Sequence, residues 1–303
     1  MLPKSVALKR SLLRNPATAG WILVLPGVIL LFTFLILPFF LSFILSLTNQ
    51  RLIPNPNVPT RFIGLKNYLR LFTDTAFLKA LFNNFYFVTL VVPVQTVLAL
   101  MMALLINRRK PGIYIFRTIY FSPVVITMVV VSIVWYLLYN PDKGFINWVL
   151  NKISFGAIPS INWLTNTKTA LPSIMILSIW QGAGFQMIIF LAGLQDIPEE
   201  LFEAARVDGA TKTQQFTRIT LPMLRNTTLF VIISTSILAF KLFQQVWVMT
   251  KGGPQNSTIT AIMYLYTQGF RQLKVGYASS IAVIFFIIVL AVSLIQRHFL
   301  KEK

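Results

Sequence analysis

The chain has 303 residues, of which 56% are hydrophobic and only 12% charged, and its mean hydropathy is +0.71. Both the hydrophobic fraction and the mean hydropathy are higher than a soluble domain tolerates, so they predict a membrane protein. The 27 basic and 8 acidic residues give a net charge of +19, which attraction to anionic lipid headgroups explains without any need for nucleic acid. The absence of cysteine excludes disulfides and thiolate chemistry.

Six apolar runs reach the length of about 18 residues that predicts a transmembrane helix. They cover residues 21–48, 81–106, 118–139, 170–193, 226–249 and 278–296. All should be helical, because backbone polar groups have no water to bond inside lipid. The first run is too long for the core of a signal peptide, so we expect it to be retained. The predicted fold is all-α, with an N-terminal segment over 1–20 and a single transmembrane domain over 21–303.

The distribution of Lys and Arg predicts that both termini are cytoplasmic. Basic residues are denser in one alternating set of segments than in the loops between them. The denser set comprises residues 1–20, 107–117, 194–225 and 297–303. The sharpest cluster is Arg108, Arg109 and Lys110, directly before the third run.

The chain lacks the residues typical of two mechanisms, ion-coupled secondary transport and ATP hydrolysis. None of the six runs contains Asp or Glu, and the single histidine, His298, lies near the C-terminus. Proton relays and sodium-coupled carriers usually place ionisable groups near the membrane midplane, so a stand-alone secondary carrier is disfavoured. No Gly-rich loop is followed by Lys-Ser/Thr, so we do not expect this chain to hydrolyse ATP. We predict no catalytic residue, metal site or cofactor here, and any uphill transport needs a partner that supplies energy.

An acidic loop stands out between the fourth and fifth runs. Five of the eight acidic residues of the chain fall between residues 196 and 208. Pro198 suits the first turn of a helix, and Gly209 suits the left-handed residue that follows one. The sequence therefore predicts a helix of about ten residues over 198–209, then a second short polar helix over about 211–218. Composition alone is compatible with an ordinary solvated helix or with a docking surface.

This loop resembles the EAA loop of bacterial ABC importer permeases. The residues that carry the resemblance are Glu203, Ala204, Ala205, Asp208, Gly209, Ala210, Phe216, Ile219, Leu221 and Pro222. The resemblance implies the MetI-like permease fold in the bacterial inner membrane, with the 194–225 loop docked on an ATPase subunit. It implies that Glu203 pairs with a basic group there and that Ala204 and Ala205 permit close approach. The implied coupling residues are Phe202, Glu203, Ala204, Ala205, Asp208 and Gly209.

Three further segments resemble the carbohydrate-uptake branch of this family, namely residues 62–68, 116–123 and 250–254. One departure is Gln244, where relatives often carry Asp. The implied partners are a second homologous permease, two subunits that bind ATP and Mg²⁺, an external solute-binding protein, a carbohydrate substrate and membrane lipid.

Polar residues within the runs are candidates for the substrate pathway, because a sugar presents hydroxyl edges and C–H faces to amides and aromatic rings. The candidates are Trp180, Gln181, Gln186, Lys241, Gln244 and Gln245, with Asn83, Asn84, Tyr86 and Gln95 as weaker ones. We favour Gln181 and Gln244 most. Each amide could equally bond another helix, and aromatic residues near span ends are commonly interfacial. Lys241 either extends to the membrane surface or faces the pathway.

The sequence thus predicts half of a translocation pathway for a carbohydrate: a mono- or oligosaccharide, a polyol or a glycosylglycerol. The alternative is an anionic sugar derivative, such as glycerol phosphate or a uronate. A stand-alone secondary carrier and a non-transporting scaffold are the rival classes.

Overall fold

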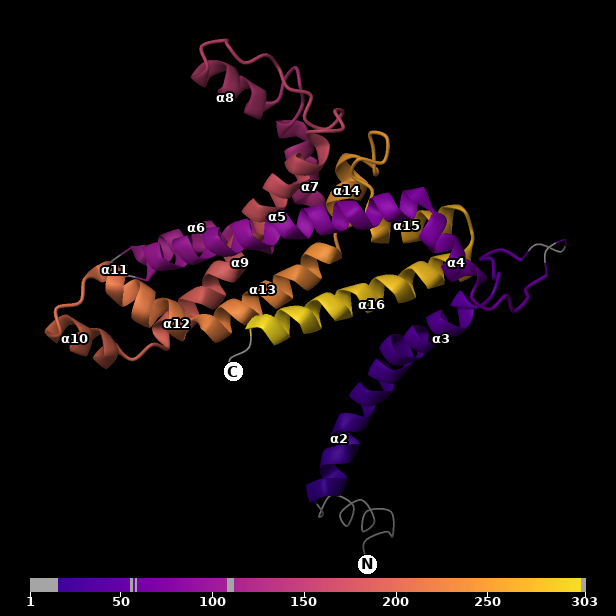
Figure 1. Ribbon diagram of the computed structural model, residues 1–303, viewed down its shortest axis with the longest axis horizontal. Helices are drawn as coiled ribbons and strands as arrows, with labels where there is room; N and C mark the ends of the chain where they lie inside the picture. Colours follow the sequence, from indigo (N-terminus) through magenta and orange to yellow (C-terminus); the bar gives the residue numbers. More distant parts are fainter. Residues whose placement is uncertain (1–15, 55–56, 58, 108–111, 301–303) are drawn as a thin grey trace, which may run out of the picture. The chain divides into compact units, whose positions relative to one another are not determined.

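The computed structural model describes residues 16–54, 57, 59–107 and 112–300 (Figure 1). Regular structure in these residues is helical, and one isolated antiparallel bridge joins Thr48 and Phe62. The chain divides into two compact units, Met1–Leu69 with Gln268–Val283 and Arg70–Thr267 with Ile284–Lys303. All the predicted coupling and pathway residues belong to the second unit. The predicted basic cluster at 108–110 lies outside the described residues.

Five helical segments are long and apolar enough to cross a membrane. They are Gly20–Ser46, Thr75–Ile106, Ala170–Gln195, Arg225–Met249 and Val275–Phe299. These segments match five of the six predicted spans. The predicted span 118–139 is instead a pair of helices, Ile113–Val125 and Met128–Leu138, bent by 96°. The described residues thus hold five spans, or six if the bent pair is counted as one.

The first unit holds the N-terminal helices and a loop region. Its elements are α2 (Pro16–Leu31), the π-helical turn η1 (Phe32–Ile36), α3 (Leu37–Ser46), the start of α4 (Lys66–Thr73), most of the π-helical turn η3 (Thr267–Arg271) and the start of α16 (Val275–Leu300). Asn67 Nδ2 donates to the carbonyls of Ser46, at 2.7 Å, and Thr48, at 2.9 Å. The Gly276 amide donates to the Gln50 carbonyl at 2.9 Å. These bonds tie the loop after α3 to both α4 and α16.

The second unit holds the helices around the candidate site. They are α5 (Thr75–Ile106), α6 (Ile113–Val125), α7 (Met128–Leu138), α8 (Phe145–Ile153), α9 (Ala170–Gln195), α10 (Glu199–Val207), α11 (Lys212–Gln215), η2 (Phe216–Thr220), α12 (Leu221–Met223), α13 (Arg225–Phe240), α14 (Gln244–Met249), α15 (Ala261–Tyr266) and the rest of α16. α5 begins six residues before the predicted span at 81, because Asp74 caps it. The Asp74 carboxylate accepts from the amides of Ala76, at 3.1 Å, and Phe77, at 3.2 Å.

α9 is the central helix of this unit and packs against α5, α6 and α13. Within lipid, helices associate through close contact rather than through burial from water, so small residues favour such packing. Gly184 shows this directly, because a Cβ atom there would lie 2.2 Å from the Tyr120 carbonyl oxygen on α6. Ala99 and Ala103 on α5 are fully buried in the core that contains Phe190.

The predicted span 118–139 breaks at Ile126 and Thr127, just after Pro123. Pro123 lies inside α6, lacks an N–H and therefore leaves the Ile119 carbonyl without its helical partner. The Ser122 hydroxyl donates to that carbonyl at 2.9 Å. Ile126, the residue that ends α6, is extended, and α7 starts after Thr127. The prediction of one uninterrupted helix over 118–139 was therefore wrong.

The predicted span 226–249 is also interrupted, between α13 and α14. Two carbonyls at the break are satisfied by side chains from other helices or loops. Asn84 Nδ2 donates to the Phe240 carbonyl at 3.0 Å, and Thr260 Oγ1 donates to the Leu242 carbonyl at 2.8 Å. Asn84 Oδ1 also accepts from the Ala261 amide at 2.8 Å. Asn84 therefore ties α5 to α13 and α15.

We expect Asn84→Ala to destabilise the protein by about 2 kcal/mol, because it leaves a buried carbonyl and a buried amide unpaired. Intrinsic tryptophan fluorescence during heating of the purified protein measures the shift in melting temperature. Asn151→Ala is the control, because Asn151 is an exposed residue in the last turn of α8. Equal melting temperatures for the two variants would contradict the role given to Asn84.

Candidate functional site

A cavity of about 490 Å³ lies in the second unit, between α5, α9, α13 and the two helix breaks. Five amide side chains line it: Gln95, Gln181, Gln186, Gln244 and Gln245. Three hydroxyl side chains join them: Ser178, Ser234 and Thr235. Phe87, Phe185 and Leu238 supply apolar surface. Among the described residues that line the cavity, Lys241 is the one charged side chain.

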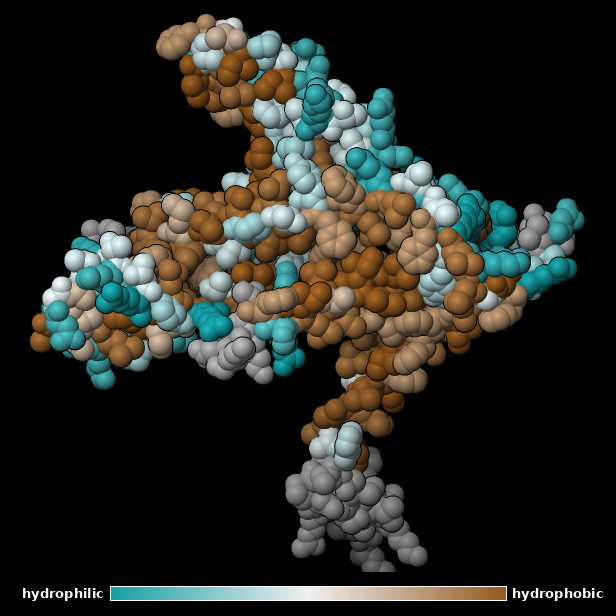
Figure 2. All heavy atoms as spheres, viewed as in Figure 1, coloured by the Kyte–Doolittle hydropathy of each residue, from teal (hydrophilic) through white to brown (hydrophobic). Residues whose placement is uncertain are grey.

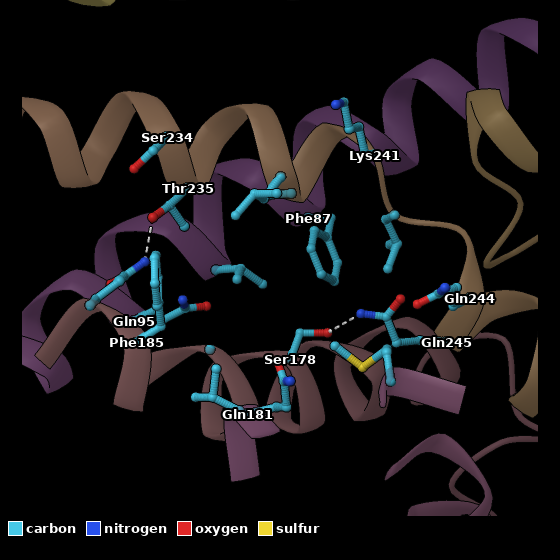
Figure 3. Close-up of a pocket in the computed structure, with 18 of the residues that line it drawn as sticks. Phe87, Gln95, Ser178, Gln181, Phe185, Ser234, Thr235, Lys241, Gln244 and Gln245 are labelled. Atoms are coloured by element: carbon cyan, nitrogen blue, oxygen red, sulfur yellow. Dashed lines mark hydrogen bonds between the residues drawn. The ribbon is translucent and has the colours of Figure 1, made fainter. Parts of the chain in front are cut away.

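Hydrogen bonds hold several of these amides in place (Figure 3). Gln245 Nε2 on α14 donates to Ser178 Oγ on α9 at 3.4 Å. Gln181 Nε2 donates to the Pro123 carbonyl on α6 at 3.5 Å. Gln186 Nε2 donates to Thr235 Oγ1 on α13. The cavity walls are therefore connected through the same polar side chains that face the cavity.

The chemistry of this lining suits recognition rather than catalysis. Amides and hydroxyls donate and accept hydrogen bonds, and neighbouring apolar faces pack against C–H groups. No carboxylate or histidine occurs among the described lining residues. In the part of the chain that the structure describes, no group of three or more His, Cys, Asp or Glu side chains gathers around a possible metal position.

The structure brings most of the predicted pathway residues together. Gln181, Gln186, Gln244, Gln245 and Lys241 all line the cavity, as does the weaker candidate Gln95. Lys241 lies in the break between α13 and α14, and Figure 3 shows its amino group directed away from Gln181 and Ser178.

Four predicted pathway residues lie elsewhere, since none of them lines the cavity. One is Asn84, which joins α5 to α13 and α15 as described above. Asn83 is 2% exposed and donates to the carbonyls of Asn256, at 3.2 Å, and Ile259, at 2.9 Å. Trp180 packs against Trp135 with ring centroids 5.5 Å apart. Tyr86 stacks on a neighbouring ring of its own helix, that of Phe82.

The hydroxyl residues of the cavity could not be selected from the sequence pattern. Ser178 Oγ donates to the Ile174 carbonyl at 2.7 Å, and Ser234 Oγ donates to the Phe230 carbonyl at 2.7 Å. Such bonds to the residue four positions earlier are ordinary for Ser and Thr in helices. Their spacing therefore carries no signal that distinguishes a cavity residue from any other helical serine.

A second feature is the acidic loop, which forms the predicted helix α10 between Glu199 and Val207. Pro198 is the residue just before the helix rather than part of its first turn. Gly209 has φ +78° and so takes the left-handed conformation, as the sequence predicts. The Gly209 amide donates to the Arg206 carbonyl at 3.1 Å, and the Ala210 amide donates to the Ala205 carbonyl at 2.8 Å. These two bonds close the helix end as a Schellman motif.

α10 has one face attached to the body and one face free. Phe202 is partly buried and packs against the core cluster that contains Leu194. Glu203 and Arg206 point outward as an exposed ion pair, with 3.7 Å between their charged groups. Val207 is 88% exposed. In Figure 2, hydrophilic residues gather around α10 and α11, while hydrophobic residues cover the neighbouring length of α5 and α6. The outward face therefore combines charge with an unburied apolar side chain.

The turn after α10 leads into a second short helix, shorter than the predicted 211–218. Thr211 and Gln214 form a reciprocal capping box at the start of α11. The helix then continues as the π-helical turn η2. A cavity of about 900 Å³ lies beside α10 and includes Arg117, Glu199 and Lys212 in its lining. α10 is thus anchored through Phe202 but is not packed along its whole length.

Comparison with known protein sequences gives three findings. Residues 74–302 match the family described as binding-protein-dependent transport system inner membrane component. The chain is 37% identical to the probable ABC transporter permease protein YurN of Bacillus subtilis (strain 168), over 79% of this chain and 82% of that protein. It is 33% identical to the lactose transport system permease protein LacF of Rhizobium radiobacter, over 97% and 98% of the two chains.

The fold is similar to that of a chain in the bacterial alginate ABC transporter, solved in complex with an alginate pentasaccharide-bound periplasmic protein. The TM-score is 0.81 at 23% sequence identity, and the match covers 92% of this chain and 93% of the other. At this identity the likeness concerns the fold.

Proposed function

The chain belongs to the family of binding-protein-dependent transport system inner membrane components, and we propose that its own cargo is a carbohydrate. In this proposal the chain is a multi-pass permease subunit of an ABC importer, with both termini in the cytoplasm. It forms half of the translocation pathway and performs no chemistry on its substrate.

The observation that carries the proposal is the amide-rich cavity at the two helix breaks. Its five glutamines and three hydroxyl residues offer hydrogen bonds to a polyhydroxyl compound, and Phe87 and Phe185 offer apolar faces. The relative named as a lactose transport permease supports the same class of cargo. Lys241 at the cavity favours, as a second candidate, an anionic derivative such as glycerol phosphate or a uronate.

The exposed face of α10 supports the proposed route of energy transfer. A second permease would complete the pathway, and two further subunits would bind ATP and Mg²⁺. Glu203, Ala204, Ala205 and Asp208 would contact the ATPase, while Gly209 sets the turn and Phe202 connects the helix to the core. An external solute-binding protein would deliver the substrate.

We expect the complete assembly in lipid vesicles to accumulate a neutral disaccharide only when ATP, the ATPase and the binding protein are all present. Accumulation of radiolabelled lactose, maltose or trehalose measures this. Glycerol 3-phosphate and digalacturonate, tested in parallel, represent the anionic candidate. Uptake that continues without the ATPase would identify a stand-alone carrier. An assembly that binds the ATPase but transports none of these compounds would instead support the rival interpretation, in which the chain is a non-transporting membrane scaffold.

A further inference from the structure

Gln95 and Gln186 lie at one end of the cavity, together with Thr235, and we name these three residues the amide floor. Gln186 follows Gln181 by five positions along α9, in the direction of α10. Figure 3 shows Gln95 and Thr235 at the opposite end of the cavity from Gln244 and Gln245. Gln186 is 2% exposed and Gln95 is 6% exposed, so both side chains are almost completely enclosed.

Gln186 carries a hydrogen-bond acceptor without a donor. Its Nε2 donates to Thr235 Oγ1, whereas its Oε1 is buried and has no partner among the described residues. A buried polar atom left unpaired is unfavourable, and such atoms are uncommon in folded proteins. Because Gln186 lines the cavity, a donor that enters the cavity can satisfy this oxygen.

Gln95 supplies the matching donor group. Among the described residues, none forms a hydrogen bond with the Gln95 side-chain amide, although Gln95 is only 6% exposed. Gly182 makes room for it, because a Cβ atom at Gly182 would lie 2.4 Å from Gln95 Nε2. The floor therefore combines an enclosed amide on α5 with an unpaired carbonyl on α9.

We propose that the amide floor selects a neutral, hydroxyl-bearing end of the substrate and disfavours a carboxylate or phosphate there. A sugar hydroxyl can accept a hydrogen bond from Gln95 Nε2 and can donate one to the unpaired Gln186 Oε1. An ionised carboxylate or phosphate oxygen only accepts, so it would face the Gln186 carbonyl without a proton to share. No cation belongs to the floor to offset the burial of such a charge. The inference rests on the proposed function and narrows its substrate class.

The chain offers a closely matched control outside the cavity. Gln296 Nε2 on α16 donates to Ser236 Oγ on α13 at 2.8 Å, and Gln296 Oε1 is also buried without a partner among the described residues. Gln296 does not line the cavity. Gln296→Leu and Gln186→Leu therefore both remove a buried side-chain amide with an unpaired oxygen. Only Gln186→Leu removes such an amide from the amide floor.

The test measures ATP-driven uptake of lactose, maltose and trehalose, and of a deoxy analogue of whichever is transported, by the complete assembly in vesicles. We expect Gln186→Leu to lower uptake of the parent sugar about tenfold, which corresponds to 1.4 kcal/mol, and Gln296→Leu to change it less than twofold. The analogue that lacks the recognised hydroxyl should be taken up poorly by the wild type. Gln186→Leu should take up this analogue and its parent equally, because the two changes remove the same interaction.

Equal effects of Gln186→Leu and Gln296→Leu would overturn the inference. So would a persistent difference in uptake between the parent sugar and every deoxy analogue in the Gln186→Leu variant. In each of these cases wild-type uptake remains dependent on ATP, and the proposed importer stands. If the wild type moves no compound in response to ATP, the proposed function itself fails and the floor falls with it.

Discussion

Gly184→Ala is expected to prevent stable packing of α9 against α6. The added Cβ atom would lie 2.2 Å from the Tyr120 carbonyl oxygen and 3.3 Å from Phe121 Cα. Both are backbone atoms, so no side-chain rotation relieves the contact and one helix must move away. Overpacking of this kind costs about 3 kcal/mol, which exceeds the gain of about 1 kcal/mol that alanine brings to a helix. The recovery of monodisperse protein after detergent extraction, and its melting temperature, measure the effect.

Gly27→Ala is the control for this prediction. Gly27 also lies in an apolar helix of membrane-spanning length, α2, but nothing lies within 4 Å of the position that its Cβ would take. This variant should be recovered like the wild type and melt at the same or a slightly higher temperature. If Gly184→Ala behaves in the same way, the close contact between α6 and α9 does not limit packing.

Gly209→Pro is expected to lower both substrate-stimulated ATP hydrolysis and transport by the assembly. Proline fixes φ near −65°, whereas Gly209 has φ +78°. The substitution also removes the bond from the Gly209 amide to the Arg206 carbonyl. The Schellman turn then opens, and α10 loses its fixed direction relative to α11. We expect substrate-stimulated ATP hydrolysis by the assembly in lipid to fall at least about tenfold, a loss of about 1.4 kcal/mol in coupling.

The matched variant for this turn is Gly209→Asn, because asparagine enters the left-handed region more readily than most residues. It should keep most of the stimulated hydrolysis. Co-purification of the ATPase subunit separates loss of binding from loss of coupling. Normal transport by Gly209→Pro would show that α10 is a solvated connector, contrary to the mechanism proposed here.

Features set by neighbouring residues could be predicted from the sequence. Five of the apolar runs correspond to helices of membrane-spanning length in the described residues. These could be predicted because the length and hydrophobicity of a span are properties of one continuous segment. The turn at Gly209 follows from a glycine placed directly after a short helix. The start of α5 was missed, since it depends on the Asp74 cap just outside the apolar run.

Features set by distant residues could not be predicted in this way. The break after Phe240 is stabilised by Asn84, which is 156 positions away in the chain. An amide in an apolar run also has the same sequence appearance in either of two roles. Asn83 binds loop carbonyls and Gln181 faces the cavity, and only the tertiary contacts distinguish them.

The continuity of α9 has a mechanical consequence. The two neighbouring helical segments break at the cavity, but α9 runs unbroken from Ala170 to Gln195 and leads directly into the loop before α10. Among the glycines of α9, Gly184 makes the closest approach to a neighbouring helix, and it divides α9 into arms of about 21 Å and about 17 Å at 1.5 Å per residue. A rigid rod that tilts about such a pivot swings its two ends in opposite directions by similar amounts. In the proposed importer, a pull on α10 that tilts α9 about Gly184 would therefore move the two ends of this cavity-lining helix in opposite directions.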